Sequence, residues 1–428
     1  MELHVPNRGS DDWHKLSNYN EVDHTGFRPV AIDHDLNIAY GWKKLNGRIA
    51  LYSVGLDDAL TEKLVYSRPD VDLSGLIRIG RDGRVVGVSY STDVGKAEFF
   101  VDDYKQVMNA LRQALPQLPL VSIVDTSADE KKVLVFAGSD IDPGSYFIMD
   151  RQANKLRKFL GTRALLEGAR LGRDKAITYT TADGTSIPGY LTLPPGVEDP
   201  KGLPAIVMPH GGPGSRDVWG FDWLAQFYAA RGFVVLQPEY RGSAGFGDDW
   251  FVNNGFKSWD IAVGDVVAAG RWLVKQGIAD PSKLATVGWS YGGYAALQSV
   301  AIDPTLFKAI VAIAPVTDLA ALKEEHRWWT DYTMLSNYVG DGPHMHDGSP
   351  IAHAAQFKQP VMFFHGTSDI NVSVEQSKNM NAALKAAGAH SDLVIFEDHD
   401  HQLEDSIVRI DMLRQSDAFL RRSLGMSE

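Results

Sequence analysis

The sequence contains no cysteine among its 428 residues. Disulfides, thiolate zinc sites and cysteine nucleophiles are therefore excluded. Long apolar runs are also missing, because no stretch reaches the length that spans a bilayer. The first residues, Met1–His4, lack the basic start and apolar stretch of a signal peptide. We therefore expect a soluble protein with no membrane segment, and its compartment, cytoplasmic or periplasmic, stays unknown.

Positive charge is in deficit. The chain has 42 lysine and arginine residues against 54 aspartate and glutamate residues, which gives a formal net charge of −12. This balance argues against nucleic acid as a partner, because phosphates bind basic surfaces. Apolar residues make up 44% of the chain, so a chain of this length can form two domains with cores of their own.

Glycine is concentrated around one serine, in the motif GWSYGG at residues 288–293. The motif follows the apolar run 284–287 and precedes the run 294–297, which suits a helix opening. A serine with glycine two positions away on each side, between a strand and a helix, is typical of a nucleophile elbow, since glycine lets so sharp a turn close. Ser290 is therefore the candidate nucleophile. The alternative is an ordinary glycine-rich loop, in which the same pattern also occurs.

The residues that follow Ser290 favour the catalytic interpretation. Asp369 comes just after the apolar run 361–364, and open α/β sheets place functional groups at the carboxyl ends of their strands. A further apolar run leads into a loop that holds two histidines, His399 and His401. Serine, acid and histidine follow one another in this order in α/β-hydrolases. The histidine takes the serine proton and the carboxylate fixes the imidazole tautomer, and both histidines fit this role.

A glycine pair follows the apolar run 203–208, within the segment HGGPG at residues 210–214. Backbone N–H groups of such a turn can point toward a developing negative charge. In hydrolases with an elbow, one donor is the residue after the nucleophile, here Tyr291, and the other lies in this earlier loop, where we choose Gly212. The alternative is a tight turn of glycine and proline without a catalytic role.

These motifs together resemble the prolyl oligopeptidase family of serine peptidases, and within it the acylaminoacyl-peptidase and dipeptidyl-peptidase-like bacterial members. The resemblance extends from about Ala176 to the C-terminus. The segments that carry it are 210–214, 240–243 with 245–247, 288–294, and 365–366 with Asp369 and Val372.

The resemblance implies that His401 is the base, because the acidic loop and the apolar residue of the family pattern then align with residues 396–398 and Leu403. Asp400 and Gln402 flank His401, where the family carries glycine. Glu239 likewise stands where the family often carries asparagine.

The remaining apolar pattern predicts the fold class of residues 170–428. The runs 232–237 and 309–314 are nearly continuous, as in parallel strands buried on both faces. Helical patterns such as 263–273 lie between these runs, and this alternation predicts an α/β-hydrolase with a doubly wound, mostly parallel sheet. Residues 176–191 predict an antiparallel hairpin at the edge of the sheet.

Residues 1–165 have a different pattern. Asp35, Asp82 and Asp129 recur every 47 residues, each in a turn before a β-rich run that is followed by a second run with aromatic residues. A repeat of this length is typical of propeller blades, and the family resemblance implies a β-propeller before the hydrolase. Residues 104–111 predict an inserted amphipathic helix.

Three blades are too few to close a ring. We therefore expect a partial β-propeller in an N-terminally truncated chain, and an exposed blade edge that favours self-association. The alternative is a small independent β-domain that caps the hydrolase.

Several other side chains are candidates for weaker roles. Arg241 is a candidate for substrate binding, or it pairs with a local acid such as Asp248 or Asp249. Trp328 and Trp329 lie after a strand end and are candidates for lining a substrate pocket, or for core packing. The histidines at 344, 346 and 353 lack further ligands at metal spacing, so we expect no metal.

The sequence therefore predicts a serine peptidase that hydrolyses short peptides through an acyl-enzyme, with the triad Ser290, Asp369 and His401 and the oxyanion donors Gly212 and Tyr291. The resemblance implies oligopeptide substrates, and no cofactor is needed. Two alternatives stay open: an esterase that uses the same triad, and a non-catalytic interaction protein that works through its blades.

Overall fold

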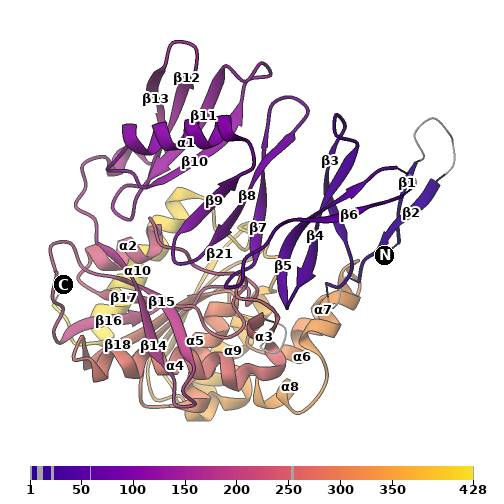
Figure 1. Cartoon of the computed structure of the whole chain (residues 1–428). Helices are drawn as coiled ribbons and strands as arrows, with labels where there is room; N and C mark the ends of the chain where they lie inside the picture. Colours follow the sequence, from indigo (N-terminus) through magenta and orange to yellow (C-terminus); the bar gives the residue numbers. More distant parts are fainter. Residues whose placement is uncertain (1, 7–12, 21–23, 58, 252–254, 428) are drawn as a thin grey trace. The chain divides into compact units, whose positions relative to one another are not determined.

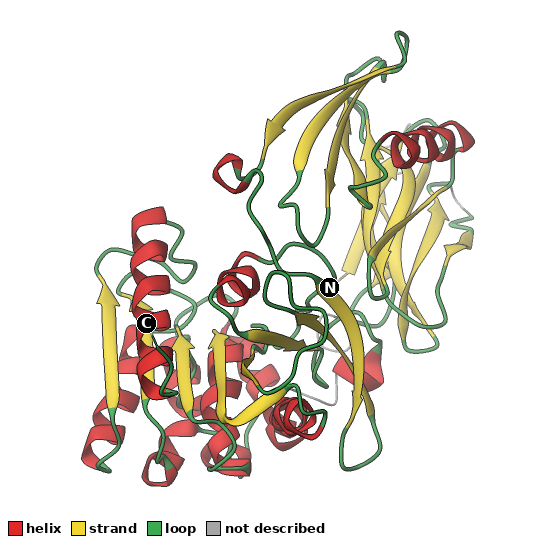
Figure 2. Cartoon of the chain, turned by 90° about the vertical axis from the view of Figure 1, so that its left-hand side faces the viewer, coloured by secondary structure: helices red, strands yellow, loops and turns green. Residues whose placement is uncertain are grey.

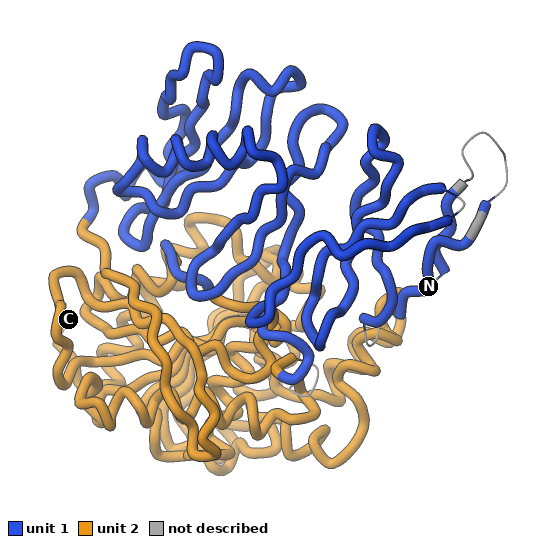
Figure 3. Tube along the Cα trace, viewed as in Figure 1, with its two compact units in different colours: residues 1–169, 218–221, 245–249 blue, residues 170–217, 222–244, 250–428 orange. Residues whose placement is uncertain are grey.

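The structure is a computed structural model that describes residues 2–6, 13–20, 24–57, 59–251 and 255–427. The chain forms two compact units (Figure 3). Unit 1 contains residues 1–169, 218–221 and 245–249, and unit 2 contains residues 170–217, 222–244 and 250–428. Within the described ranges, no helix has both the length and the apolarity needed to cross a bilayer.

Unit 1 is built from small antiparallel sheets, which Figure 1 labels along the chain. The first is the pair β1 (Glu2–Pro6) and β2 (Trp13–Asn18). The second sheet holds β3 (Arg28–Asp33), β4 (Ile38–Leu45), β5 (Arg48–Gly55) and β6 (Glu62–Tyr66). The third holds β7 (Leu73–Ile79), β8 (Arg84–Ser91) and β9 (Gly95–Phe99). The fourth holds β10 (Leu120–Thr126), β11 (Lys132–Gly138), β12 (Ser145–Asp150) and β13 (Lys155–Gly161), and is followed by the short helix η1 (Ala164–Leu166).

The repeat seen in the sequence corresponds to these sheets. Asp35, Asp82 and Asp129 lie in the turns that connect the first two strands of the second, third and fourth sheets. After β9 the chain forms the predicted helix, α1 (Asp102–Ala114), so the third sheet has a helix at the point where the other two have a fourth strand. The apolar face of α1 is buried, and its buried residues are Tyr104, Val107, Met108 and Leu111. The all-β segment is therefore blade-like, with one blade modified by a helix.

Unit 2 contains one sheet of eight strands in the order β14-β15-β17-β16-β18-β19-β20-β21. The predicted hairpin forms its antiparallel edge, and the pairs from β17 to β21 are parallel. The strands are β14 (Asp174–Thr180), β15 (Ser186–Thr192), β16 (Leu203–Val207), β17 (Val234–Pro238), β18 (Ala279–Trp289), β19 (Ala309–Ile313), β20 (Val361–Gly366) and β21 (Ser391–Phe396).

Helices cover both faces of this sheet (Figure 2). One face packs on α2 (Trp223–Ala230) and α10 (Ser406–Ser423), and the other on α4 (Trp259–Lys275), α5 (Tyr291–Ile302) and α9 (Val374–Ala386). In β20, Met362 and Phe364 contact the α10 side, whereas Val361 and Phe363 contact the α9 side. This alternation buries both faces, as expected for a doubly wound sheet.

The remaining helices are short and lie in connections. They are α3 (Asp248–Phe251), η2 (Phe256–Ser258), α6 (Leu319–Glu325), α7 (Tyr332–Val339), α8 (His344–Asp347) and η3 (Pro350–Gln356).

Candidate active site

Ser290 lies in a strained turn between β18 and α5. Its backbone angles, φ 59° and ψ −122°, belong to a region that residues with a side chain rarely adopt. Its N–H donates to the carbonyl of Ile313 at 2.8 Å. A Cβ on Gly288 would lie 2.1 Å from the carbonyl oxygen of Gly292, and one on Gly292 would lie 2.1 Å from that of Pro209. The turn therefore needs both glycines, as in a nucleophile elbow.

The candidate acid and base meet beyond the ends of β20 and β21. A hydrogen bond of 2.6 Å joins His401 Nδ1 to Asp369 Oδ2. Both residues are buried. The other carboxylate oxygen of Asp369 accepts the N–H groups of Asn371 and Val372, each at 2.9 Å. These contacts fix the orientation of the carboxylate. Nε2 of His401 is then the ring nitrogen that could accept a proton from a nucleophile.

The charge of Asp369 is held by its neighbours. Burial acts against the carboxylate, but hydrogen bonds from His365 and His401 outweigh it and hold the pKa of Asp369 well below its ordinary value. His365 is fully buried, and its Nε2 lies 3.2 Å from Asp369 Oδ2. His365 belongs to the motif at residues 365–366, and the sequence alone indicated no role for its side chain. Its place at the end of the buried strand β20 was the available signal.

The loop after β21 is anchored at several points. Trp289, beside the candidate nucleophile, donates its indole N–H to the carbonyl of His401 at 2.9 Å. Arg409 of α10 donates to the carbonyls of Leu403 and Gln402 at 2.9 and 3.0 Å. These two anchors were missed in the sequence, because nothing in the local pattern links them to this loop.

The residues flanking His401 are explained by the same turn. Asp400 accepts the N–H groups of Gln402 and Leu403, each at 3.1 Å, so its side chain closes the turn where the family carries glycine. His399 is half-buried, and its Nδ1 lies 2.6 Å from the carbonyl of Glu397. The structure thus brings His401, and not His399, to Asp369. Within the described residues, the hydroxyl of Ser290 forms no hydrogen bond with His401.

The loop after β16 lies against the elbow. A Cβ on Gly211 would lie 3.4 Å from the Cβ of Ser290, so the backbone of this loop approaches the serine closely. Gly212 has a φ of +123° and is exposed. Tyr291 is the first residue of α5, where backbone N–H groups lack intrahelical acceptors. Its ring is buried and packs on Tyr240 and Tyr294.

The loop after β17 anchors the loop after β16. Tyr240 donates its hydroxyl to the carbonyl of His210 at 2.8 Å, and His210 Nε2 lies 2.7 Å from Ser243 Oγ. Glu239, fully buried, accepts the N–H of Asp217 at 2.6 Å. Burial, followed by the charge of Asp217, raises the pKa of Glu239 well above its ordinary value. In this position a carboxyl oxygen accepts the hydrogen bond that an asparagine side chain would also accept.

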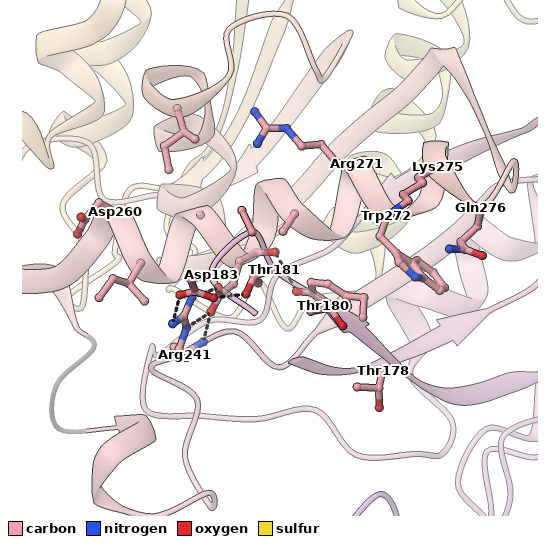
Figure 4. Close-up of a pocket in the computed structure, with 17 residues that line it drawn as sticks. Thr178, Thr180, Thr181, Asp183, Arg241, Asp260, Arg271, Trp272, Lys275 and Gln276 are labelled. Atoms are coloured by element: carbon pink, nitrogen blue, oxygen red, sulfur yellow. Dashed lines mark hydrogen bonds and ion pairs between the residues drawn. The ribbon is translucent and has the colours of Figure 1, made fainter. Parts of the chain in front are cut away.

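Arg241 lies elsewhere in unit 2. It forms a bidentate contact with Asp265 of α4, with bonds of 2.9 and 2.7 Å, and a third bond of 2.7 Å to Asp183 (Figure 4). The expected pairing with Asp248 or Asp249 is therefore wrong, because the partners come from α4 and the hairpin turn. These residues line a cavity of about 560 Å³ whose lining includes no residue of the candidate triad.

Trp328 and Trp329 lie between α6 and α7. Their side chains are 90% and 46% exposed, so the core-packing alternative is wrong. His344 and His353 each lie within hydrogen-bond distance of a backbone carbonyl, at 2.8 and 2.7 Å.

The eight-stranded sheet, the elbow at Ser290 and the paired Asp369 and His401 define the class: an α/β-hydrolase. Residues 219–427 match the model of the prolyl oligopeptidase family, to which this part of the chain belongs. The chain is 30% identical over 359 residues to dipeptidyl aminopeptidase BIII of Pseudoxanthomonas mexicana, covering 79% of this chain and 51% of that protein. It is 28% identical over 251 residues to the human acylamino-acid-releasing enzyme, covering 56% and 34%.

Solved structures share the fold. A puromycin-hydrolyzing peptidase of Mycobacterium tuberculosis superposes with a TM-score of 0.79 at 21% identity, over 97% of this chain and 64% of that one. The acylaminoacyl peptidase of Pyrococcus horikoshii gives a TM-score of 0.75 at 16% identity, over 100% and 66%. The chain spans about half the length of the first curated relatives, at 51% and 58%.

Proposed function

We propose that the protein is a serine peptidase that hydrolyses peptide bonds of short peptides through an acyl-enzyme. Ser290 attacks the carbonyl carbon, His401 takes the serine proton and returns it to the leaving amine, and Asp369 orients His401 and stabilises its charged form. The backbone N–H groups of Gly212 and Tyr291 stabilise the oxyanion. Water then repeats the attack on the acyl-enzyme and regenerates Ser290.

The observation that carries this proposal is the 2.6 Å hydrogen bond between His401 and Asp369, in a loop that is itself bonded to Trp289. Trp289 immediately precedes Ser290, so this contact supports the approach of base and nucleophile. Relatives named as aminopeptidase and acylamino-acid-releasing enzyme support amide rather than ester substrates.

A fluorophosphonate probe tests the nucleophile. We expect one labelled serine in the folded protein and no labelling in Ser290→Ala, because only a serine activated by a base reacts readily with the probe. Mass spectrometry of the labelled peptide identifies the serine. Persistent labelling of Ser290→Ala, or no labelling of the folded wild-type protein, contradicts the assignment.

Matched substrates test the reaction class. We expect the protein to cleave a peptide p-nitroanilide as well as the p-nitrophenyl ester of the same acyl group. Turnover of the ester alone, with an intact and labelled Ser290, would favour the esterase instead.

A further inference from the structure

A small cavity of about 190 Å³ in unit 2 is lined by residues of the loops that carry Gly212, Ser290 and His401. Its lining includes Gly211, Trp289 and Gln402, which are the sequence neighbours of Gly212, Ser290 and His401. Trp289 also holds the carbonyl of His401. Since the base delivers its proton to the leaving amine, we expect a cavity lined by the loop of His401 to receive the leaving-group part of a substrate.

The walls of this cavity combine aromatic and apolar surface. Trp223 and Trp289 meet edge to face, with ring centroids 6.4 Å apart. Met208 and Leu224 add aliphatic surface. Indole faces and aliphatic groups bind the methylene stem of a long side chain, and indoles also attract cations.

One arginine also lines the cavity, and its hydrogen-bond donors are turned to the backbone. Arg409 donates to the carbonyls of Leu403 and Gln402, and its guanidinium lies 5.0 Å from the ring centroid of Trp223. It is therefore held as part of the wall.

Asp217 supplies the unmatched group. It lines the cavity, and its Oδ2 is buried with no hydrogen-bond partner in the part of the chain that the structure describes. Glu239, which accepts the N–H of Asp217, also has a buried oxygen, Oε2, without a partner among the described residues. Burial raises the pKa of Asp217, and the carboxylates of Asp222 and Asp174 raise it further, whereas a hydrogen bond from Gln237 and the charge of Arg216 act in the opposite direction without outweighing burial. A cation in the cavity would reverse this cost by pairing with the ionised carboxylate.

We propose that this cavity binds the side chain of the residue directly after the scissile bond and selects a basic one, lysine or arginine. The inference rests on the proposed peptidase function. The cationic head group pairs with Asp217, and its stem packs on Trp223 and Trp289. An acidic side chain meets the carboxyl group of Asp217 and is disfavoured.

Three fluorogenic peptides test the selection. They share the acyl side and differ only after the scissile bond, where they carry lysine, its neutral analogue norleucine, or glutamate. In the wild-type protein we expect kcat/KM for lysine to exceed that for norleucine by about tenfold, the size of a typical charge-assisted contact. Glutamate should be the poorest of the three. In Asp217→Asn the ratio of lysine to norleucine should fall to about one.

Asp199→Asn is the matched control, because Asp199 is an exposed acid in the same unit that pairs with Lys201. It should keep the full preference for lysine. Equal kcat/KM for lysine and norleucine in the wild-type protein overturns the inference, and so does a preference for glutamate. Absence of both hydrolysis and probe labelling overturns the proposed function instead.

A second measurement does not depend on the folding of the Asp217→Asn variant. The acyl-enzyme of the wild-type protein can be intercepted by added amines, which enter the leaving-group side. We expect lysinamide to compete with water better than norleucinamide does. Equal partition between the two amides contradicts a basic subsite.

Discussion

Single side chains around His401 make it a better candidate for the base than His399, its neighbour in the same loop. His401 is 7% exposed and bonded to Asp369, whereas His399 is half-buried and lies against the carbonyl of Glu397. A base that is held in one tautomer and one orientation needs no reorganisation when the nucleophile attacks. The position of the loop depends in turn on Trp289 and Arg409, which hold its carbonyl groups.

His401→Ala is therefore expected to lower kcat by about four to six orders of magnitude, the loss seen when a triad member is removed. His399→Ala is the matched control and should leave kcat nearly unchanged. Steady-state kinetics on one peptide substrate, together with circular dichroism to verify folding, make the comparison. The reverse pattern would assign the base to His399.

Other residue contacts could not be predicted from the sequence. The acidic partners of Arg241 are Asp183 and Asp265, which are 58 and 24 residues away along the chain. Their approach depends on how the hairpin β14–β15 meets α4, and local sequence does not encode this distance. Asp369 and Ser290 were predictable as candidates, because Ser290 directly follows β18 and Asp369 lies three residues after the buried strand β20.

At the scale of elements, the elbow depends on backbone contacts that leave no room for side chains. Gly292 is the second residue of α5, and a methyl group there would meet the carbonyl oxygens of Pro209 and His210 at 2.1 and 3.0 Å. Both carbonyl oxygens belong to the backbone of the loop that follows β16, so they cannot move away from the methyl group without shifting that loop.

We expect Gly292→Ala to lower the free energy of unfolding by about 3 kcal/mol or more, at or above the upper end of the usual cost of overpacking. The variant should also lose labelling by the fluorophosphonate probe. Gly264→Ala in α4 is the matched control, because its Cβ would meet nothing within 4 Å. Alanine at this helix position should raise stability by about 0.5–1 kcal/mol. Denaturant unfolding compares the two variants. Equal stability of both would show that the elbow tolerates the methyl group.

Strands were predictable in proportion to their burial. The strands β16, β17, β19 and β20 and the second half of β18 are nearly continuous apolar runs. In unit 1 the two runs of each repeat correspond to β4 and β5, β8 and β9, and β11 and β12. The outer strands escaped notice: in β13, Phe159 and Leu160 are 60% and 57% exposed, and the strand shows no burial alternation. Both faces of β13 are largely exposed, so apolar and polar residues do not alternate along the strand, and this alternation is the pattern by which a strand is recognised in a sequence.

At the scale of the whole molecule, buried ionisable groups set how the free energy of unfolding changes with pH. Burial lowers the pKa of His210 to about 4 from its ordinary 6.5. The stability linked to the neutral form of His210 is therefore complete above pH 6.5 and is lost as pH falls through 4, about 3 kcal/mol in total. Asp369, whose pKa is also lowered, adds a loss at still lower pH.

Glu239 acts in the opposite direction. Because burial raises the pKa of Glu239 above its ordinary 4.5, its contribution is complete below pH 4.5 and is lost as pH rises toward the folded pKa. The two slopes together give a maximum of stability in the mildly acidic to neutral range. His210 contributes to the acid slope together with Asp369, and Glu239 contributes to the slope at higher pH together with Asp217, so a single substitution should flatten a slope without abolishing it.

His210→Gln should flatten the acid slope between pH 6.5 and 4, because the neutral amide cannot gain the proton that the unfolded histidine binds. Glu239→Gln should raise stability above pH 4.5, because its amide oxygen still accepts the N–H of Asp217 and no carboxylate forms in either state. Urea midpoints measured at half-unit pH intervals on the full chain report both effects. An unchanged acid slope in His210→Gln would mean that His210 is protonated in the folded protein. A loss of stability in Glu239→Gln above pH 4.5 would mean that the buried acid is charged and paired, which would also remove the reason for a cation beside Asp217.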